Sequence, residues 1–79
     1  MHLKMFDVIR DNKLKIIYYE NKLNIINYKR ILIFDKNKVS IDTLNKVIVV
    51  RGEDLLITKF VNDELLITGK IKEIKMEDL

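Results

Sequence analysis

The sequence predicts an all-β protein: a small antiparallel meander of about seven or eight short strands that forms a two-sheet sandwich or a rolled sheet. From residue 23 onward, apolar and mostly β-branched residues occupy alternate positions. Such alternation places one row of side chains on one face of a sheet, and β-branched residues favour strands. The pairs recur every eight residues up to residue 55, and polar connections separate them. Short strands at regular spacing are typical of sandwiches, rolls and barrels.

Length and composition indicate one small domain. The chain has 79 residues, no cysteine and a net charge of +3 from 15 Lys and Arg against 12 Asp and Glu. Without disulfides, so short a chain depends on regular packing or on self-association. The lysines are spread along the chain, which is typical of a solvated surface. We expect a cytoplasmic protein, because no apolar run approaches the length of about 20 residues that spans a bilayer, and the first residues lack a secretory signal.

The expected elements follow in order along the chain. Residues 1–12 are expected to form an N-terminal arm or an edge strand, and residues 13–79 a single all-β domain. A first strand over 14–18 places Tyr18 on one face and Ile17 on the other. The row that faces the core is then expected to comprise Leu23, Ile25, Ile31, Ile33, Val39, Ile41, Val47, Val49, Leu55, Ile57, Leu65 and Ile67. In the last strand the step of three from Ile71 to Ile74 predicts a β-bulge near Lys72 and Glu73.

Polar connections are expected at residues 19–22, 35–38, 43–46, 51–54 and 61–64, which supply Asn, Asp and Gly. We expect positive φ at Gly52, and a kink or a close backbone approach at Gly69. A solenoid is the rival explanation of an eight-residue period. The meander is favoured because the connections are typical of tight reversals and the period lengthens after residue 57.

A repeated hexapeptide fits this scheme. The stretches "EDLLIT" at 53–58 and "DELLIT" at 63–68 lie ten residues apart. They are predicted to be two neighbouring strands, each preceded by an acidic turn. The carboxylates at 53–54 and 63–64 are then solvated turn residues rather than metal ligands or catalytic acids.

The other face of the strands is also partly apolar, which is unusual for a sheet with one wet face. Either the sheet folds over so that both sides are covered, or one side is an interface, since a large bare apolar patch invites association. Both explanations remain open. The residues expected to contact a partner are Ile26, Tyr28, Leu32, Phe34, Ile48 and Val50.

The residues do not indicate a catalytic, cofactor or metal site. The single serine, Ser40, lies within a predicted strand, and the single histidine, His2, lies near the start of the chain. Two isolated glycines cannot build a phosphate loop. We therefore expect no enzyme activity, no cofactor and no metal.

Binding of single-stranded nucleic acid is the alternative function. Small basic β-barrels stack bases on aromatic side chains next to lysines. The candidate residues are scattered over different strands, and we do not expect nucleic acid as the main partner. They are Tyr18, Tyr19, Tyr28, Phe34 and Phe60, with Lys15, Lys29 and Arg30 near them.

Residues 23–76 resemble the YabP/YqfC family of sporulation proteins. The resemblance lies in an ordered set of segments: "NIINYKRILIF", "VSIDT", "VIVVRGEDLLITKF" and "DELLITGKIKEIKM". The chain departs from the family at residues 28–30 and 44–46, where family members often have glycine. Asn45 can adopt the left-handed conformation that glycine would supply, and Arg30 does so less readily.

The resemblance implies a role in endospore formation, in spore-envelope or coat assembly, without catalytic residues. Together with the strand pattern, it leads us to expect a non-enzymatic assembly factor that acts in the mother cell, at the forespore surface. The expected partners are proteins: a second copy of the chain or a membrane-associated sporulation protein. The expected contacts are an apolar strand face or an exposed strand edge.

Overall fold

The fold is an antiparallel sheet of six strands, seen in a computed structural model that describes residues 13–61 and 63–78. This confirms the all-β class. Within the described ranges there is no helix that could cross a membrane. The predicted arm at 1–12, with His2, lies outside them. The strands are β1 (Lys15–Tyr19), β2 (Lys22–Ile26), β3 (Arg30–Phe34), β4 (Lys38–Asp42), β5 (Lys46–Val61) and β6 (Glu64–Asp78).

The predicted count of seven or eight strands is wrong because two pairs of predicted strands are each one long strand. β5 has 16 residues and β6 has 15. The connection expected at 51–54 is a bend inside β5 rather than a reversal. The repeated hexapeptides do lie side by side as predicted, in β5 and β6, with Ile57 directly opposite Ile67.

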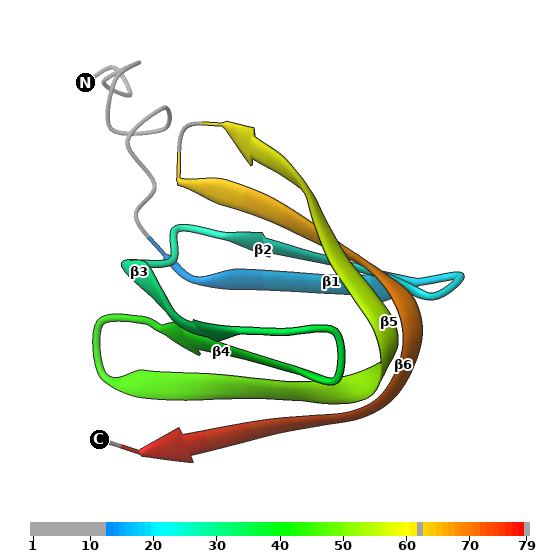
Figure 1. The fold of residues 1–79 in the computed structure, drawn as a ribbon. Coiled ribbons are helices and arrows are strands. Elements are labelled where there is room, and N and C mark those ends of the chain that lie inside the picture. Colours follow the sequence, from blue (N-terminus) through cyan, green and yellow to red (C-terminus); the bar gives the residue numbers. More distant parts are fainter. Residues whose placement is uncertain (1–12, 62, 79) are drawn as a thin grey trace, which may run out of the picture.

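The sheet folds over at this bend into two layers, which is the rolled alternative of the prediction. Figure 1 shows β5 and β6 running together along the bottom of the view, turning at the right and continuing to the top. The first layer contains β1, β2, residues 64–68 of β6 and residues 56–61 of β5. The second layer contains β3, β4, residues 46–51 of β5 and residues 70–78 of β6.

The strand order departs from a meander at one place. Strands follow β1-β2-β6-β5-β4-β3 across the sheet, and every pairing is antiparallel. Strands β3 to β6 form a meander, but β2 pairs with β6 and not with β3. The chain therefore crosses from the first layer to the second through residues 27–29. Antiparallel neighbours also rule out a solenoid for the described part of the chain.

Asn27 holds this crossing in place. Its φ is 69°, a left-handed conformation that asparagine tolerates. Its backbone N–H donates to the Asp63 carbonyl at 2.7 Å, and its side-chain amide donates to the Lys13 carbonyl at 2.7 Å. The left-handed residue of this segment is thus Asn27 and not Arg30. Asn45 likewise does not have positive φ.

The core lies between the two layers and largely matches the predicted row. Its members are fully or almost fully buried aliphatic residues, and burying one such side chain stabilises a fold by about 1.5–3 kcal/mol. They are Leu23, Ile25, Val39, Ile41, Ile48, Val50, Leu55, Leu65 and Ile67. The half-buried Ile31 and Ile57 pack against them.

The predicted face is wrong for the first half of β5, where Ile48 and Val50 point between the layers. Val47 and Val49 lie on the other face, opposite Asp42 and Ser40, and Val49 is nevertheless buried as predicted, with 6% exposure. The side chains change faces within β5 because β5 has one extra residue, between Glu53 and Leu56, relative to β6. A single extra residue moves every following side chain to the other face.

The alternation of core-facing and outward-facing side chains is also interrupted in β3. The register between β3 and β4 shifts between Ile31 and Ile33, so Leu32 is the extra residue of a bulge. Ile31 therefore packs against the core, whereas Ile33 faces outward and is 43% exposed. The predicted core position of Ile33 is wrong. The bulge predicted near Lys72 is confirmed, since Arg51 pairs with Glu73 and Gly52 with Ile71, which leaves Lys72 as the extra residue.

Two glycines make the bend possible because the chains approach closely there. A Cβ on Gly52 would lie 2.0 Å from the Lys70 carbonyl oxygen, and one on Gly69 would lie 2.5 Å from the Asp54 carbonyl oxygen. Gly69 also has φ of 126°, which favours glycine. Of the kink or close backbone approach predicted at Gly69, the close approach is confirmed. The positive φ predicted at Gly52 is wrong, and its requirement for glycine is steric.

The loop between β3 and β4 braces the bend. The Gly52 N–H donates to the Asn37 carbonyl at 3.1 Å, and the Asn37 side-chain amide donates to the Gly52 carbonyl at 3.1 Å. The Leu55 N–H donates to the Lys36 carbonyl at 2.9 Å. The loop is itself fixed by the Asp35 Oδ1 atom, which accepts from the N–H groups of Asn37 and Lys38 at 2.8 Å each.

Candidate protein-binding surface

Within residues 13–61 and 63–78, folding the sheet in half leaves four strand segments with a paired neighbour on one side only. In the first layer these are β1 and residues 56–61 of β5. In the second layer they are β3 and residues 70–78 of β6. We call these segments the open edges. An open edge presents unpaired backbone N–H and C=O groups, to which another chain can add a strand.

Exposed large apolar side chains coincide with the open edges. Among the described residues they are Ile17, Tyr18, Tyr19, Leu32, Ile33, Phe34, Leu56, Val61, Ile74 and Met76, together with Leu44. Leu44 alone lies off the edges, in the turn after β4, where it is 77% exposed. Apolar surface beside unpaired backbone can supply affinity and side-chain selectivity to an incoming strand. The arrangement is therefore suited to protein contact.

The residues predicted to form an interface do not gather in one patch. Ile26 is half-buried on the outer face of the first layer, opposite Glu64. Tyr28 is half-buried in the crossing and packs against the core. Leu32 and Phe34 lie on the β3 edge and are 46% and 49% exposed. Only these last two join an open edge.

Ile48 and Val50 are a correction to the predicted interface. Both have 0% exposure and belong to the core cluster. They point between the layers because β5 carries the extra residue at the bend. A fully buried side chain offers no surface to a partner, so burial within the chain explains their apolar character.

The β3 edge exposes apolar side chains, and hydrogen bonds to β4 hold the beginning of the strand in place. Arg30 Nε donates to Asp42 Oδ2 at 3.0 Å, and the Lys29 N–H donates to the Asp42 carbonyl at 2.8 Å. These contacts tie the beginning of β3 to β4. Beyond them, the bulge at Leu32 reverses the alternation, so Ile33 lies on the outer face opposite Ser40 and Phe34 on the core side opposite Val39. Leu32 and Phe34 are both about half exposed.

The β1 edge also exposes apolar side chains, although none of the predicted interface residues lies on it. Ile17, Tyr18 and Tyr19 are 47%, 50% and 47% exposed. The available signal was the run of four apolar residues at 16–19, which gives a strand apolar side chains on both faces. Its significance depends on β1 being the outermost strand, which only the strand order reveals.

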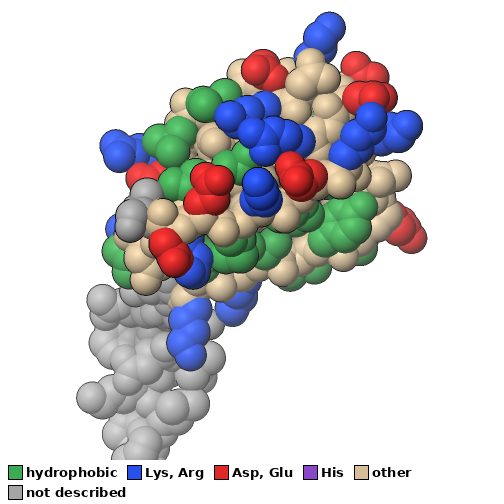
Figure 2. Space-filling model, turned by 90° about the horizontal axis from the view of Figure 1, so that it is seen from below, with side chains coloured by type: hydrophobic (Ala, Val, Ile, Leu, Met, Phe, Trp, Pro, Cys, Tyr) green, Lys and Arg blue, Asp and Glu red, His purple; other side chains and the backbone are tan. Residues whose placement is uncertain are grey.

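The β6 edge is different because charged side chains line it. Lys46 Nζ lies 2.6 Å from Asp78 Oδ1, Arg51 Nη1 lies 3.2 Å from Glu73 Oε1, and Lys72 Nζ lies 2.6 Å from Glu53 Oε2. Figure 2, which views the molecule from below, shows charged side chains of both signs interleaved, with apolar side chains beside them.

Two of these pairs lower carboxyl pKa values. The hydrogen bond and charge of Lys72, with the charge of Lys70, lower the pKa of Glu53. Lys46 lowers the pKa of Asp78 in the same way. All these groups are exposed, and exposed pairs contribute little to stability. They do make this edge a charged one.

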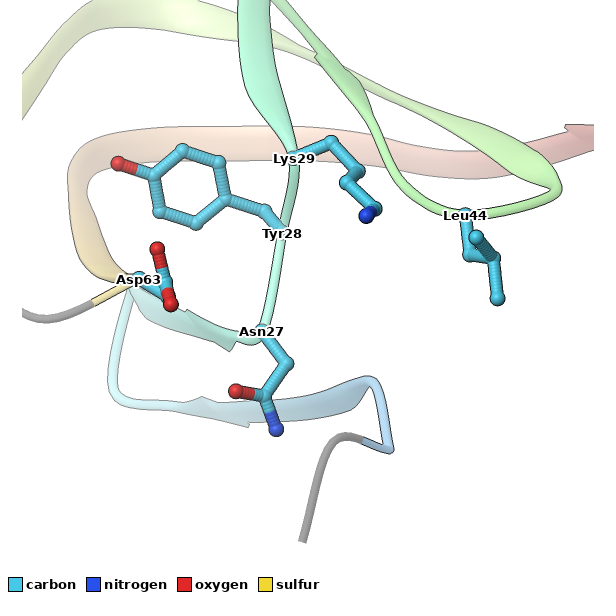
Figure 3. A pocket seen from close by; sticks show the side chains of 5 residues that line it. All are labelled: Asn27, Tyr28, Lys29, Leu44 and Asp63. Atoms are coloured by element: carbon cyan, nitrogen blue, oxygen red, sulfur yellow. The ribbon is translucent and has the colours of Figure 1, made fainter. Parts of the chain in front are cut away.

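A shallow pocket opens among three connections at the end of the fold opposite the bend. It has a volume of about 420 Å³ and is lined by Asn27, Tyr28, Lys29, Leu44 and Asp63. Figure 3 shows Tyr28 and Lys29 leaving the crossing in opposite directions, with Asp63 on the side of Tyr28 and Leu44 beyond Lys29. The lining side chains spread apart, so we assign no ligand to the pocket.

The residues of the nucleic-acid alternative are also dispersed. Tyr18 and Tyr19 are consecutive in β1 and so point to opposite faces, and Tyr28 lies in the crossing. Phe34 is on β3, and the side chain of Phe60 is outside the described part. This alternative stays a prediction. Within residues 13–61 and 63–78, no three acidic or histidine side chains gather in an arrangement suited to a metal ion.

Comparison with known proteins gives one result. Neither the curated proteins nor the solved structures contain a match to the chain. The model of the YabP family matches residues 11–79, which include every strand of the sheet. The resemblance inferred from the ordered segments is thereby confirmed, and it indicates a sporulation-related protein. The chain belongs to the YabP family.

Proposed function

We propose that the protein is a non-enzymatic assembly factor in the formation of the spore envelope or coat. It acts in the cytoplasm of the mother cell, at the forespore surface, by binding other proteins through its open edges. Membership of the YabP family supports the link to sporulation. The observation that carries the binding role is the coincidence of exposed apolar side chains with unpaired strand edges.

The β3 edge is the proposed contact for a heterologous partner. Leu32 and Phe34 expose apolar surface there, while Arg30 and Asp42 hold the start of the strand in position. An extended segment of a partner would pair with β3 and cover these two side chains. Such strand addition takes affinity from main-chain hydrogen bonds and selectivity from side-chain contacts.

The test replaces the apolar groups of this edge in spore-forming cells. A strain that lacks the chain is complemented with the wild type, with the double variant Leu32→Ser and Phe34→Ser, or with Leu44→Ser. Leu44 is the matched control because it is exposed and apolar but lies off the edges. Heat-resistant spores are counted, and spore envelopes are inspected by electron microscopy. Circular dichroism of each purified chain checks that it is folded.

We expect the double variant to be folded and to lose at least about tenfold in spore yield, because loss of a contact worth 1.4 kcal/mol is a tenfold change in binding. Leu44→Ser should match the wild type. A normal yield from the folded double variant would contradict the β3 contact, and a normal yield from the strain lacking the chain would contradict the role in sporulation.

A further inference from the structure

We infer that residues 1–12 of this chain dock on the outer face of the first layer and cover its apolar side chains. This contact is separate from the open edges of the sheet and independent of the proposed β3 contact. The surface to be covered is a set of described side chains that we call the outer patch. They are Ile17 and Tyr19 of β1, Asn24 and Ile26 of β2, Leu66 and Thr68 of β6, and Leu56 and Val61 of β5.

The strand register places the outer patch on one face of the sheet. Side chains directly opposite each other in neighbouring strands share a face. Leu23 and Ile67 point into the core, so the residues that alternate with them point outward. The outward rows, from β1 toward β5, are Tyr19, Lys22, Thr68 and Leu56, then Ile17, Asn24 and Leu66, then Lys15, Ile26, Glu64 and Val61. Apolar side chains therefore extend over all four strands of the first layer.

The apolar side chains of the outer patch are incompletely covered by the described residues. Four of them are between 47% and 58% exposed: Ile17, Tyr19, Leu56 and Val61. The outer face of the second layer is different, because charged side chains occupy most of its positions. They are Arg30, Lys38, Asp42, Arg51, Glu73, Lys75 and Glu77. A contiguous exposed apolar patch marks an interaction site, so the first layer is the side that receives an occupant.

Residues 1–12 are richer in apolar residues than a solvated tail. Six of the twelve residues are apolar, and the segment contains no Gly, Pro or Ser. The apolar residues are Met1, Leu3, Met5, Phe6, Val8 and Ile9. Segments that stay solvated are poor in such residues, because they cannot bury enough apolar surface to offset the entropy lost on ordering. The segment and the outer patch thus each supply the apolar surface that the other needs.

The segment is joined to the fold at one end of the outer patch. The Lys13 carbonyl accepts a hydrogen bond from the Asn27 side-chain amide at 2.7 Å, and Leu14 packs against the core. Asn27 directly follows Ile26, which is a member of the outer patch. The point of attachment is therefore next to the surface that the segment is to cover.

The segment is also long enough to cover the outer patch. From β1 to β5 there are three strand spacings, or about 14 Å. Twelve residues span about 18 Å as a helix and up to about 40 Å when extended. The covalent tether favours this occupant over a second copy of the chain, because a joined segment acts at an effective concentration in the mM range.

The first measurement detects the contact directly in the full chain. Nuclear Overhauser effects are recorded by NMR at a concentration where sedimentation equilibrium gives the 9.4 kDa mass of one chain. We expect cross-peaks from the side chains of residues 1–12, those of Phe6 and Ile9 among them, to Ile17, Leu56 or Leu66. Val47, on the outer face of the second layer, should show none.

Absence of cross-peaks between residues 1–12 and the outer patch would overturn the inference. Cross-peaks that arise only between copies, in a mixture of isotopically labelled and unlabelled chains, would also overturn it, because the occupant would then be a second copy.

The second measurement removes the apolar side chains of the segment. The triple variant Leu3→Ser, Phe6→Ser and Ile9→Ser should lower the ratio of docked to undocked chains at least about tenfold, since loss of 1.4 kcal/mol is a tenfold change. Methyl chemical shifts of the outer patch report this ratio, and those of the core residue Ile41 check that the sheet is intact. The matched control is Lys4→Ser with Arg10→Ser, which changes two charged residues of the same segment and should leave the ratio unchanged. Equal effects of the two variants would contradict apolar docking.

The third measurement changes the outer patch instead. Leu56→Ser should weaken docking at least about fivefold, because the exposed part of the leucine would no longer contribute apolar contact. The control is Ile33→Ser, because Ile33 is 43% exposed but lies on the outer face of the second layer. Release of the segment by Ile33→Ser, or full docking in Leu56→Ser, would place the contact elsewhere and overturn the inference.

Discussion

Gly69 and Gly52 determine where the two long strands can fold in half. Each places its Cα where another backbone carbonyl leaves no room for a side chain, and Gly69 also has a φ that other residues rarely adopt. The two positions depend on each other, because Gly69 approaches Asp54 on β5 while Gly52 approaches Lys70 on β6. The bend is therefore specified by a pair of glycines on neighbouring strands.

Gly69→Ala is expected to destabilise the protein by on the order of 3 kcal/mol or more, since strained φ alone costs about 1–3 kcal/mol and the added methyl group would meet the Asp54 carbonyl. Denaturant unfolding measures the change. The control is Lys75→Ala, at an exposed position of the same strand, which should change stability by less than about 0.5 kcal/mol. Equal effects of the two substitutions would contradict a requirement for glycine at the bend.

Single residues show which core positions could be predicted from the alternation in the sequence. Alternation correctly placed Leu23, Ile41 and Ile67 in the core, because β2, β4 and the first half of β6 contain no bulge. It failed at Ile33 and Ile48 because bulges shift the phase there. A bulge on one strand is defined by its partner's register. At these two positions the strand's own residues did not reveal the bulge.

At the scale of elements, the short loop between β3 and β4 supports the bend in β5, which is distant from the loop in the sequence. The connection between β3 and β4 uses the backbone of Lys36 and both the backbone and side chain of Asn37 to bond either side of the turn in β5. The loop lies ten or more residues from its partners in the sequence. It completes hydrogen bonds for backbone groups that the bent β5 would otherwise leave without protein partners.

Asn37→Ala should remove the side-chain hydrogen bond to the Gly52 carbonyl and cost about 1 kcal/mol. The measurement is thermal or denaturant unfolding, with amide exchange at Gly52 as a local probe. The Gly52 N–H donates to the Asn37 carbonyl and should exchange faster as the loop loosens. Lys36→Ala is the control, because Lys36 contributes only its carbonyl to the brace and should leave the Gly52 amide unchanged.

The elements also show what the sequence left undetermined. It predicted the strand content and the bulge at Lys72, both from local spacing. It interpreted Gly52 and the acidic residues after it as a reversal, because a bend within a strand and a turn between strands use the same residue types. The predicted interface residues include two on the β3 edge and none on the β1 edge, since which strands are outermost follows from the pairing of β2 with β6.

At the scale of the whole molecule, the sheet has a doubly paired centre and singly paired margins. Residues 46–51 of β5 lie between β4 and β6, and residues 64–68 of β6 lie between β2 and β5. These segments also supply Ile48, Val50 and Leu65 to the core. Local opening free energies should therefore rise from the open edges toward these two segments.

Native-state hydrogen exchange, measured at a concentration where the chain is monomeric, tests this gradient. The amides of Ile48, Val50 and Leu65 should be the slowest and should exchange only through global unfolding. Those of Ile17 and Leu32 should exchange faster by about a hundredfold or more, equivalent to about 2.7 kcal/mol. Equal protection of the amides across the sheet would contradict a gradient of local opening free energies.

The pairing of β2 with β6 has a consequence for synthesis. Leu23 meets Ile67, so the hairpin of β1 and β2 has no neighbour until residues 64–68 of β6 have left the ribosome. Until then, the nascent chain can complete the hairpins of β3, β4 and β5, while the hairpin of β1 and β2 stays undocked, with one flank of each strand unoccupied. In a nascent chain that ends before residue 64, this hairpin is therefore accessible to chaperones. Once β6 emerges, it pairs with β2 and covers that flank of the hairpin.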